Sequence, residues 1–437
     1  MLQMRLKRRD QLVFPQHTMI SLLSSFFGLT LVASSFASYT ARQQPSGKVA
    51  QAYFTGFHSV DATPIFDVSQ ISWEKYNRMI YAFAETTEDP SSITLDGSNP
   101  DGISSFVEAA HNNNVRAILS IGGWTGSRFW STAVGSPENR TIFVRTVTDF
   151  VSQYQLDGLD FDWEYPNRQG LGCNVIDPND TANFVAFLKE LRQDPIGATL
   201  DLSAAVSITP YNDANEKPST DMSEFAKYLD TIMIMNYDIW GSWTDAVGPN
   251  APLNDICAPA AKQQGSAVSA VANWGKAGVP LEKIVLGVAS YGHSYEVATK
   301  DAFVDGSTTE LASYPAFNKT ARPQGDSWDT DNLTIDQCGN PQTYGGNWNM
   351  WALIGAGLLD ETGQPVDGVP YRFDDCSKTA YVYRPDQQIM ISFDDPMAFA
   401  AKGQFIKDMG LGGFGMWEAG GDYGNILVDA IREAAGF

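Results

Sequence analysis

The sequence has few of the residues that build metal centres and nucleophile sites. Its 437 residues include only four histidines and four cysteines. The histidines are scattered, without the short spacings that zinc ligands require, and are His17, His58, His111 and His293. No Gly-x-Ser-x-Gly elbow or phosphate-binding loop is present. Residues 410–415 match a dinucleotide fingerprint, but they follow a helical pattern and lead into a strand, the reverse of the required order. The sequence therefore predicts no metal and no other cofactor.

Basic residues are also scarce, because 29 Lys and Arg stand against 51 Asp and Glu, for a net charge of −22. A surface of this charge repels nucleic acid and anionic lipid. The composition therefore favours a neutral partner.

Long apolar runs are absent except for one near the N-terminus. Arg5 and the basic residues 7–9 precede an uncharged stretch, Met19–Ala37, that ends in small residues. This pattern predicts a signal peptide over residues 1–37 and a secreted, extracellular protein. A start at Met19, or retention of the stretch as a membrane anchor, is the alternative. Removal of residues 1–37 takes away four basic residues and one acidic residue and leaves a net charge of −25.

Four cysteines in a secreted chain predict two disulfides, for which three pairings exist. We expect Cys173–Cys257 and Cys338–Cys376, each joining cysteines that are neighbours in the sequence. Four Asn-x-Ser/Thr sequons fit the secretory route, at Asn139, Asn179, Asn318 and Asn332.

The most informative segment is 157–166, where carboxylates alternate with large apolar side chains. The carboxylates are Asp160, Asp162 and Glu164, and the apolar residues are Leu159, Phe161 and Trp163. On a strand, such alternation gathers the carboxylates on one face and packs the other face against a core. Carboxylates that lie close together cannot all ionise at neutral pH, so one of them is expected to hold a proton. Asp157 falls out of step and is expected to be structural.

Two other interpretations of the segment are weaker. Calcium loops also gather carboxylates, but they are rich in Gly, Asn and Asp and lack the apolar interleaving. An exposed strand without catalytic function would not alternate with Leu, Phe and Trp.

Short apolar runs alternate with helical patterns along the rest of the chain. The predicted strands are Val49–Phe57, Arg78–Ala84, Arg116–Ile121, Gly158–Trp163, Thr199–Ser207, Thr231–Asn236, Ile284–Ala289 and Gly412–Trp417. Helices are expected between most of them, for example over Asn139–Tyr154, Thr181–Arg192 and Ala260–Ala277. Eight such units predict an α/β fold of the (β/α)₈ TIM-barrel type.

About 100 residues separate the seventh strand from the next helix, near Asp395, which is too long for a loop. We expect a small α+β insertion domain there, between strands 7 and 8. The predicted organisation is a signal peptide at 1–37, a first barrel part at 38–293, the insertion at 294–388 and a last barrel part at 389–437.

Functional side chains of such barrels lie at the carboxyl ends of the strands. Besides Glu164, these ends carry Trp124 after Gly122–Gly123, the run Met235–Asp238, and Trp417. Singly, each aromatic residue is more simply explained as core. Together they predict an acidic cleft with aromatic walls, which suits a sugar.

These residues resemble the family-18 glycoside hydrolases, the chitinases. The resemblance extends from about Gln51 to the C-terminus and rests on several motifs in the same order. They are Asp-x-x-Asp-x-Asp-x-Glu (157–164), Ser-x-Gly-Gly-Trp (120–124), Met-x-Tyr-Asp (235–238), Tyr53, Tyr81–Phe83 and Trp417.

The resemblance implies hydrolysis of β-1,4-linked N-acetylglucosamine by a retaining, substrate-assisted mechanism. It implies that Glu164 is the acid and then the base, Asp162 stabilises the acetamido group, Asp160 shares a proton with Asp162, and Tyr237 orients the acetamido oxygen. The implied substrate-binding residues are Tyr53, Phe83, Trp124, Met235, Asp238, Tyr291 and Trp417. The partner would be chitin or chitooligosaccharides, bound by a monomer.

One departure concerns His293, where many members of the family have Arg, so one substrate contact differs. Two alternatives use the same machinery: an endo-β-N-acetylglucosaminidase acting on N-glycans, and a chitin-binding lectin without turnover. Lectins of this type usually lose the acid, and Glu164 is present.

Overall fold

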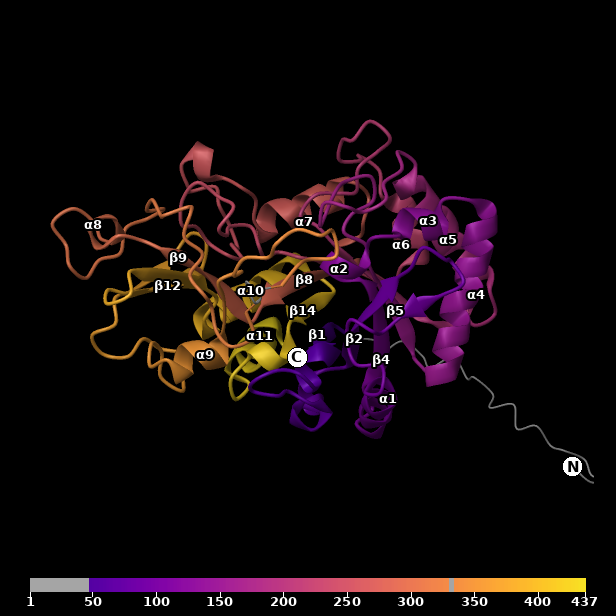
Figure 1. Ribbon diagram of the computed structural model, residues 1–437, viewed down its shortest axis with the longest axis horizontal. Helices are drawn as coiled ribbons and strands as arrows, with labels where there is room; N and C mark the ends of the chain where they lie inside the picture. Colours follow the sequence, from indigo (N-terminus) through magenta and orange to yellow (C-terminus); the bar gives the residue numbers. More distant parts are fainter. Residues whose placement is uncertain (1–46, 330–333) are drawn as a thin grey trace, which may run out of the picture. The chain divides into compact units, whose positions relative to one another are not determined.

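The computed structural model describes residues 47–329 and 334–437 (Figure 1). Within them, eight parallel strands follow the order β1-β14-β8-β7-β6-β5-β4-β2, and pairing of β1 with β2 closes the barrel. The strands are β1 (Val49–Thr55), β2 (Arg78–Thr86), β4 (Arg116–Gly122), β5 (Gly158–Asp162), β6 (Asp201–Val206), β7 (Thr231–Ile234), β8 (Ile284–Ala289) and β14 (Gly413–Trp417). A short strand, β3 (Ile93–Thr94), pairs with β2 in the antiparallel sense. The predicted TIM barrel is confirmed.

Helices follow the barrel strands. They are α1 (Ile103–Asn112), α2 (Gly123–Gly126), α3 (Trp130–Val134), α4 (Pro137–Tyr154), α5 (Asp180–Gln193), α6 (Ser223–Tyr228), α7 (Ala267–Lys276), α10 (Pro396–Met409) and α11 (Ile426–Ala435). The helix expected from Ala260 begins only at Ala267. Ser266 is the reason, because its side chain accepts a hydrogen bond from the amide of Ser269 and caps the helix.

A five-stranded antiparallel sheet is inserted between β8 and β14, in the order β10-β9-β13-β12-β11 (orange to gold in Figure 1). Its strands are β9 (Tyr291–Glu296), β10 (Asn347–Asn349), β11 (Tyr371–Asp374), β12 (Thr379–Arg384) and β13 (Ile389–Phe393), with α8 (Thr299–Ala302) and α9 (Met350–Gly355) between them. A single residue, Ser290, separates β8 from β9. An insertion between strands 7 and 8 is therefore confirmed, while the expected domain limits remain predictions.

The predicted signal peptide and the sequon at Asn332 lie outside the described residues. No helix within residues 47–329 and 334–437 is long and apolar enough to cross a membrane.

The expected disulfide pairing is wrong. The bonds join Cys173 to Cys338 and Cys257 to Cys376, with Cα–Cα distances of 5.6 and 6.2 Å. The inserted residues fold back onto barrel loops, so proximity in sequence misleads. Beside Cys338, the carbonyl of Gln337 accepts a hydrogen bond from Arg128 on the loop before α3. Each disulfide thus fastens the insertion to the barrel.

Strand β5 has the two faces that its alternation predicts. Phe161 packs outward against the ring of Phe184 on α5, with centroids 5.8 Å apart. Trp163, just after the strand, stacks on Trp130 of α3 at 5.5 Å. Asp160 and Asp162 therefore point to the other side, into the barrel.

Candidate active site

A cavity of about 610 Å³ opens at the carboxyl ends of the barrel strands. Its walls combine aromatic rings with carboxylates at or just after the ends of β5 and β7. The lining residues are Phe57, Phe83, Trp124, Thr125, Asp162, Glu164, Tyr165, Arg168, Ser207, Ile208, Thr209, Met235, Tyr237, Asp238, Ile239, Gln264 and Trp417. Eight of the eleven residues expected at the site therefore line one cavity.

Asp160 lies below this cavity and is completely buried. Its Oδ2 accepts hydrogen bonds from the hydroxyls of Tyr53 (3.0 Å) and Ser120 (2.8 Å), and its Oδ1 accepts one from Ser203 (2.6 Å). Burial raises the pKa of Asp160, and these three hydrogen bonds partly oppose that rise.

Asp162, at the end of β5, and Glu164, just after it, both reach the cavity. Burial, followed by repulsion from Glu164 and Asp160, raises the pKa of Asp162 well above its usual range. Burial also raises the pKa of Glu164 to about 7. The Oδ1 atom of Asp162 is buried without a hydrogen-bond partner among the described residues. The pair can therefore hold a proton at neutral pH and present it to a ligand.

The backbone that carries these carboxylates is fixed by Ser127. Its single hydroxyl hydrogen lies between the carbonyl oxygens of Gly123 (2.7 Å) and Asp162 (2.9 Å), which share it, and its oxygen accepts a hydrogen bond from the amide of Glu164 (3.0 Å). Gly122, at φ +114°, permits the close approach of the two strands, since a Cβ there would lie 2.1 Å from the Asp162 carbonyl oxygen.

Aromatic rings form the cavity floor. Trp417 stacks on Phe83 with centroids 5.4 Å apart and meets the edge of Tyr53 at 5.3 Å. Tyr53 itself is buried and lies behind the lining, where it bonds to Asp160. Trp124 is half exposed and also lines the cavity, so its ring is accessible to a ligand.

The wall that follows β7 contains Met235, Tyr237 and Asp238. Asp238 Oδ1 accepts a hydrogen bond from the hydroxyl of Tyr291 at 2.8 Å and lies 2.7 Å from Nε2 of His293. Tyr291 therefore stands behind Asp238 rather than in the lining. His293, at the position of the departure from the family pattern, contacts the same carboxylate oxygen.

Sequence reasoning missed Arg168, the cation of the cavity wall. Its guanidinium lies over the ring of Tyr165, 3.9 Å from the centroid, and its Nη1 is 3.4 Å from the Thr209 hydroxyl. The available signal was its place on the loop that follows the carboxylate strand, which a barrel uses for its active site. The aromatic residue Phe57 was also missed, because the sequence placed it at the end of a predicted strand, Val49–Phe57, whereas β1 ends at Thr55.

Asp157 lies apart from the cavity. It precedes β5, where its Oδ2 accepts a hydrogen bond from the amide of Ala117 and lies 2.9 Å from Nε2 of His111. No three His, Cys, Asp or Glu side chains within the described ranges are grouped so that they could hold a metal ion.

Comparison with known proteins is consistent with this geometry. Residues 49–422 match the model of the glycosyl hydrolases family 18. A chitinase-like effector of Moniliophthora roreri is 53% identical over 419 residues, which cover 96% of this chain and 100% of that protein. Chitinase A1 of Niallia circulans is 29% identical over 328 residues, covering 74% of this chain and 42% of that protein. A crystal structure of a Rhizomucor miehei chitinase superposes with a TM-score of 0.78 at 32% identity, covering 89% of this chain and 100% of that one.

Proposed function

This chain belongs to family 18 of the glycosyl hydrolases, and on that basis we propose that it is a secreted chitinase. Its substrate would be chitin or chitooligosaccharides, cleaved at β-1,4 bonds between N-acetylglucosamine units. The observation that carries the proposal is the placement of two buried carboxylates, Asp162 and Glu164, at the wall of an aromatic cavity, where burial raises the pKa of both. Secretion is supported by the two disulfides, which persist in oxidising compartments.

Glu164 acts first as the acid in this proposal. With a pKa of about 7 it is protonated in mildly acidic solution and gives its proton to the glycosidic oxygen. The bond between that oxygen and the anomeric carbon breaks while the acetamido carbonyl oxygen of the same sugar attacks that carbon. The product is an oxazolinium-type intermediate and a free sugar hydroxyl. Glu164, now ionised, removes a proton from the water that opens the intermediate with net retention.

The other buried groups support the attacking acetamido group. Asp162 accepts a hydrogen bond from the acetamido N–H and stabilises the positive charge that develops on the acetamido group. Asp160, held by three hydroxyl donors, shares a proton with Asp162. The hydroxyl of Tyr237 donates to the acetamido oxygen and aligns it. Trp417 and Phe83 pack against the apolar face of the same sugar, and Trp124 against the sugar on the leaving side.

The test is hydrolysis of chitohexaose with the product anomers resolved, for the wild type and Glu164→Gln. We expect β-anomeric products from the wild type and a loss of 10²–10⁴-fold in kcat, roughly the contribution of a general acid, for the variant. Binding of chitohexaose should persist, because the amide keeps the shape of the carboxyl. Glu74→Gln, an exposed change, is the control. Inverted products or an active Glu164→Gln enzyme would contradict the proposal.

A second candidate is a chitin-binding protein without turnover. The names of the relatives that are 53% identical, chitinase-like effectors, favour it. Tight binding of chitohexaose by the wild type with no product after prolonged incubation would establish it. Release of an N-glycan from a glycoprotein, with chitohexaose left intact, would instead indicate the endo-β-N-acetylglucosaminidase.

A further inference from the structure

The residue after Trp417 is not part of the cavity lining, and residues outside that lining hold its side chain. Glu418 is buried and extended, with φ −128° and ψ 171°. Its carboxylate accepts a hydrogen bond from the Thr55 hydroxyl and lies 2.6 Å from Nδ1 of His58. The Trp417 carbonyl accepts a hydrogen bond from the Ser290 amide at 2.9 Å, so the backbone from which the indole projects is fixed together with Glu418.

His58 is in turn covered by a ring from the insertion. Trp328 stacks on the imidazole with centroids 3.9 Å apart and an interplanar angle of 22°. The indole N–H of Trp328 donates to the Pro64 carbonyl at 2.8 Å, so the ring is fixed at a second point. Gly420 makes room for it, since a Cβ there would lie 2.8 Å from the Trp328 ring.

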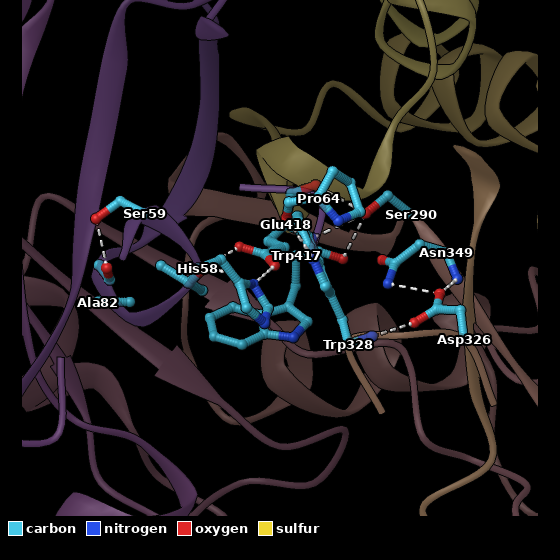
Figure 2. A network of polar contacts seen from close by, with 12 residues as sticks. His58, Ser59, Pro64, Ala82, Ser290, Asp326, Trp328, Asn349, Trp417 and Glu418 are labelled. Carbon is cyan, nitrogen blue, oxygen red and sulfur yellow. Dashed lines mark hydrogen bonds and ion pairs between the residues drawn. The ribbon is translucent and has the colours of Figure 1, made fainter. Parts of the chain in front are cut away.

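A chain of contacts leads from Trp328 back to Glu418, and Figure 2 shows the hydrogen bonds around Asp326, Asn349, Ser290 and Glu418. Asp326 accepts hydrogen bonds from the amide of Trp328 (2.8 Å) and from the amide (2.6 Å) and side chain (3.0 Å) of Asn349. The next amide, Met350, donates to the Ser290 carbonyl at 3.0 Å. The Ser290 hydroxyl donates to the Glu418 carbonyl (2.7 Å) and accepts from the Glu418 amide (2.9 Å). Glu418 is therefore held through both its backbone and its side chain.

We propose that His58 and Trp328 are positioning residues for Trp417, and that the insertion sets the orientation of the indole at the cavity floor through them. The inference rests on the proposed function for its kinetic consequence alone. Neither residue lines the cavity, so each acts through Glu418. Three separate parts of the chain meet here: the turn after β1, the segment between α8 and β10, and the end of β14.

Fluorine NMR of the protein labelled with 5-fluorotryptophan tests the proposal without requiring activity. The Trp417 resonance is assigned by its loss in Trp417→Phe. In His58→Ala and in Trp328→Leu we expect this resonance to shift and broaden, because the indole gains more than one orientation. His58→Gln, which keeps a donor for Glu418, should restore most of the wild-type line. His111→Ala is the matched control, because His111 also pairs with a carboxylate, Asp157 at 2.9 Å, away from the cavity.

Kinetics on chitohexaose give the second readout. We expect His58→Ala and Trp328→Leu to lower kcat about tenfold, with KM changed less than about twofold, because the floor acts on the distorted sugar of the transition state more than on the bound ground state. His111→Ala should leave both constants unchanged.

An unchanged Trp417 resonance in both variants would overturn the proposal. The contacts would then serve only to hold the insertion against the barrel. Parallel loss of kcat and melting temperature, without rescue by His58→Gln, would overturn it as well. If the wild type binds chitohexaose but does not cleave it, the proposed hydrolysis fails, whereas the resonance still decides the positioning role.

Discussion

The hydroxyl of Ser127 lies 2.9 Å from the carbonyl oxygen of Asp162 and donates a hydrogen bond to it. The same hydroxyl accepts from the amide of Glu164, 3.0 Å away. A side chain from the segment between α2 and α3 therefore fixes the backbone that carries Asp162, at the end of β5, and Glu164, just after it. The positions of the two carboxylates in the site therefore depend on these hydrogen bonds from Ser127.

Ser127→Ala should weaken both stability and catalysis. The buried amide of Glu164 loses its partner, which costs about 1–3 kcal/mol in the free energy of unfolding. We also expect a lower kcat on chitohexaose, because the acid is no longer held at one position. Denaturant unfolding and steady-state kinetics measure the two effects. Ser152→Ala, which removes a hydrogen bond to the Thr148 carbonyl on α4, is the control, and equal effects in the two variants would contradict the prediction.

The rate should fall as the pH rises through about 7. Glu164 must be protonated to act as the acid, and burial raises its pKa to about 7. A profile of kcat/KM against pH for a fluorogenic chitobioside reports this group in the free enzyme. A profile that keeps rising to pH 9 would contradict the assignment of Glu164.

Two charge changes should move the descending limb of the kcat/KM profile in opposite directions along the pH axis. The Arg168 cation lowers the pKa of Glu164 and the Asp238 charge raises it. Arg168→Met is therefore expected to shift the limb to higher pH, and Asp238→Asn to lower pH. Movement of both limbs in the same direction would show that neither charge acts on Glu164.

Stability should increase as the pH falls from about 7 towards 4. Burial raises the pKa of Asp422 to about 6, against about 3.9 in an unfolded chain. The folded protein thus binds the proton more tightly, so the free energy of unfolding rises as the solution becomes more acidic between these two pKa values. The rise is about 1.4 kcal/mol for each pH unit in that interval. Urea unfolding at pH 7 and pH 5 measures this, and Asp422→Asn should reduce the difference. An equal or larger difference in that variant would refute the role of Asp422.

Loss of the Cys173–Cys338 disulfide, which is half-buried, should lower the stability of the fold substantially. The bond closes a loop with a sequence separation of 165, which corresponds to about 5 kcal/mol in the chain-entropy model. The double variant Cys173→Ser/Cys338→Ser is compared with the wild type by thermal unfolding. Peptide mapping of the non-reduced protein checks the pairing, and a Cys173–Cys257 peptide would contradict the structure.

Much of the fold was predictable because it depends on local patterns. The alternation in 158–163 indicated both the strand and its two faces, and the eight apolar runs lie within a few residues of the barrel strands. The limits of elements were less predictable, since the turn at Gly56–Ser59 follows β1 without a break in the apolar pattern.

The parts that could not be predicted depend on contacts between distant residues. Cys338 meets Cys173 only because the insertion folds back over the barrel. His58 and Glu418 are 360 positions apart, and no sequence motif around either residue predicts its contact with the other. Arg168 belongs to a loop whose direction is set by tertiary packing. Local sequence patterns do not predict contacts of this kind.

The period of two in β5 limits how this protein can diverge. Insertion of one residue between Gly158 and Leu159 would exchange the faces, turning Leu159 and Phe161 into the barrel and Asp160 and Asp162 towards α5. Both the core and the chemistry would be lost in a single step. Change in this strand is thus confined to substitution at fixed length, while new substrate preferences are left to arise from the length and composition of the loops around it.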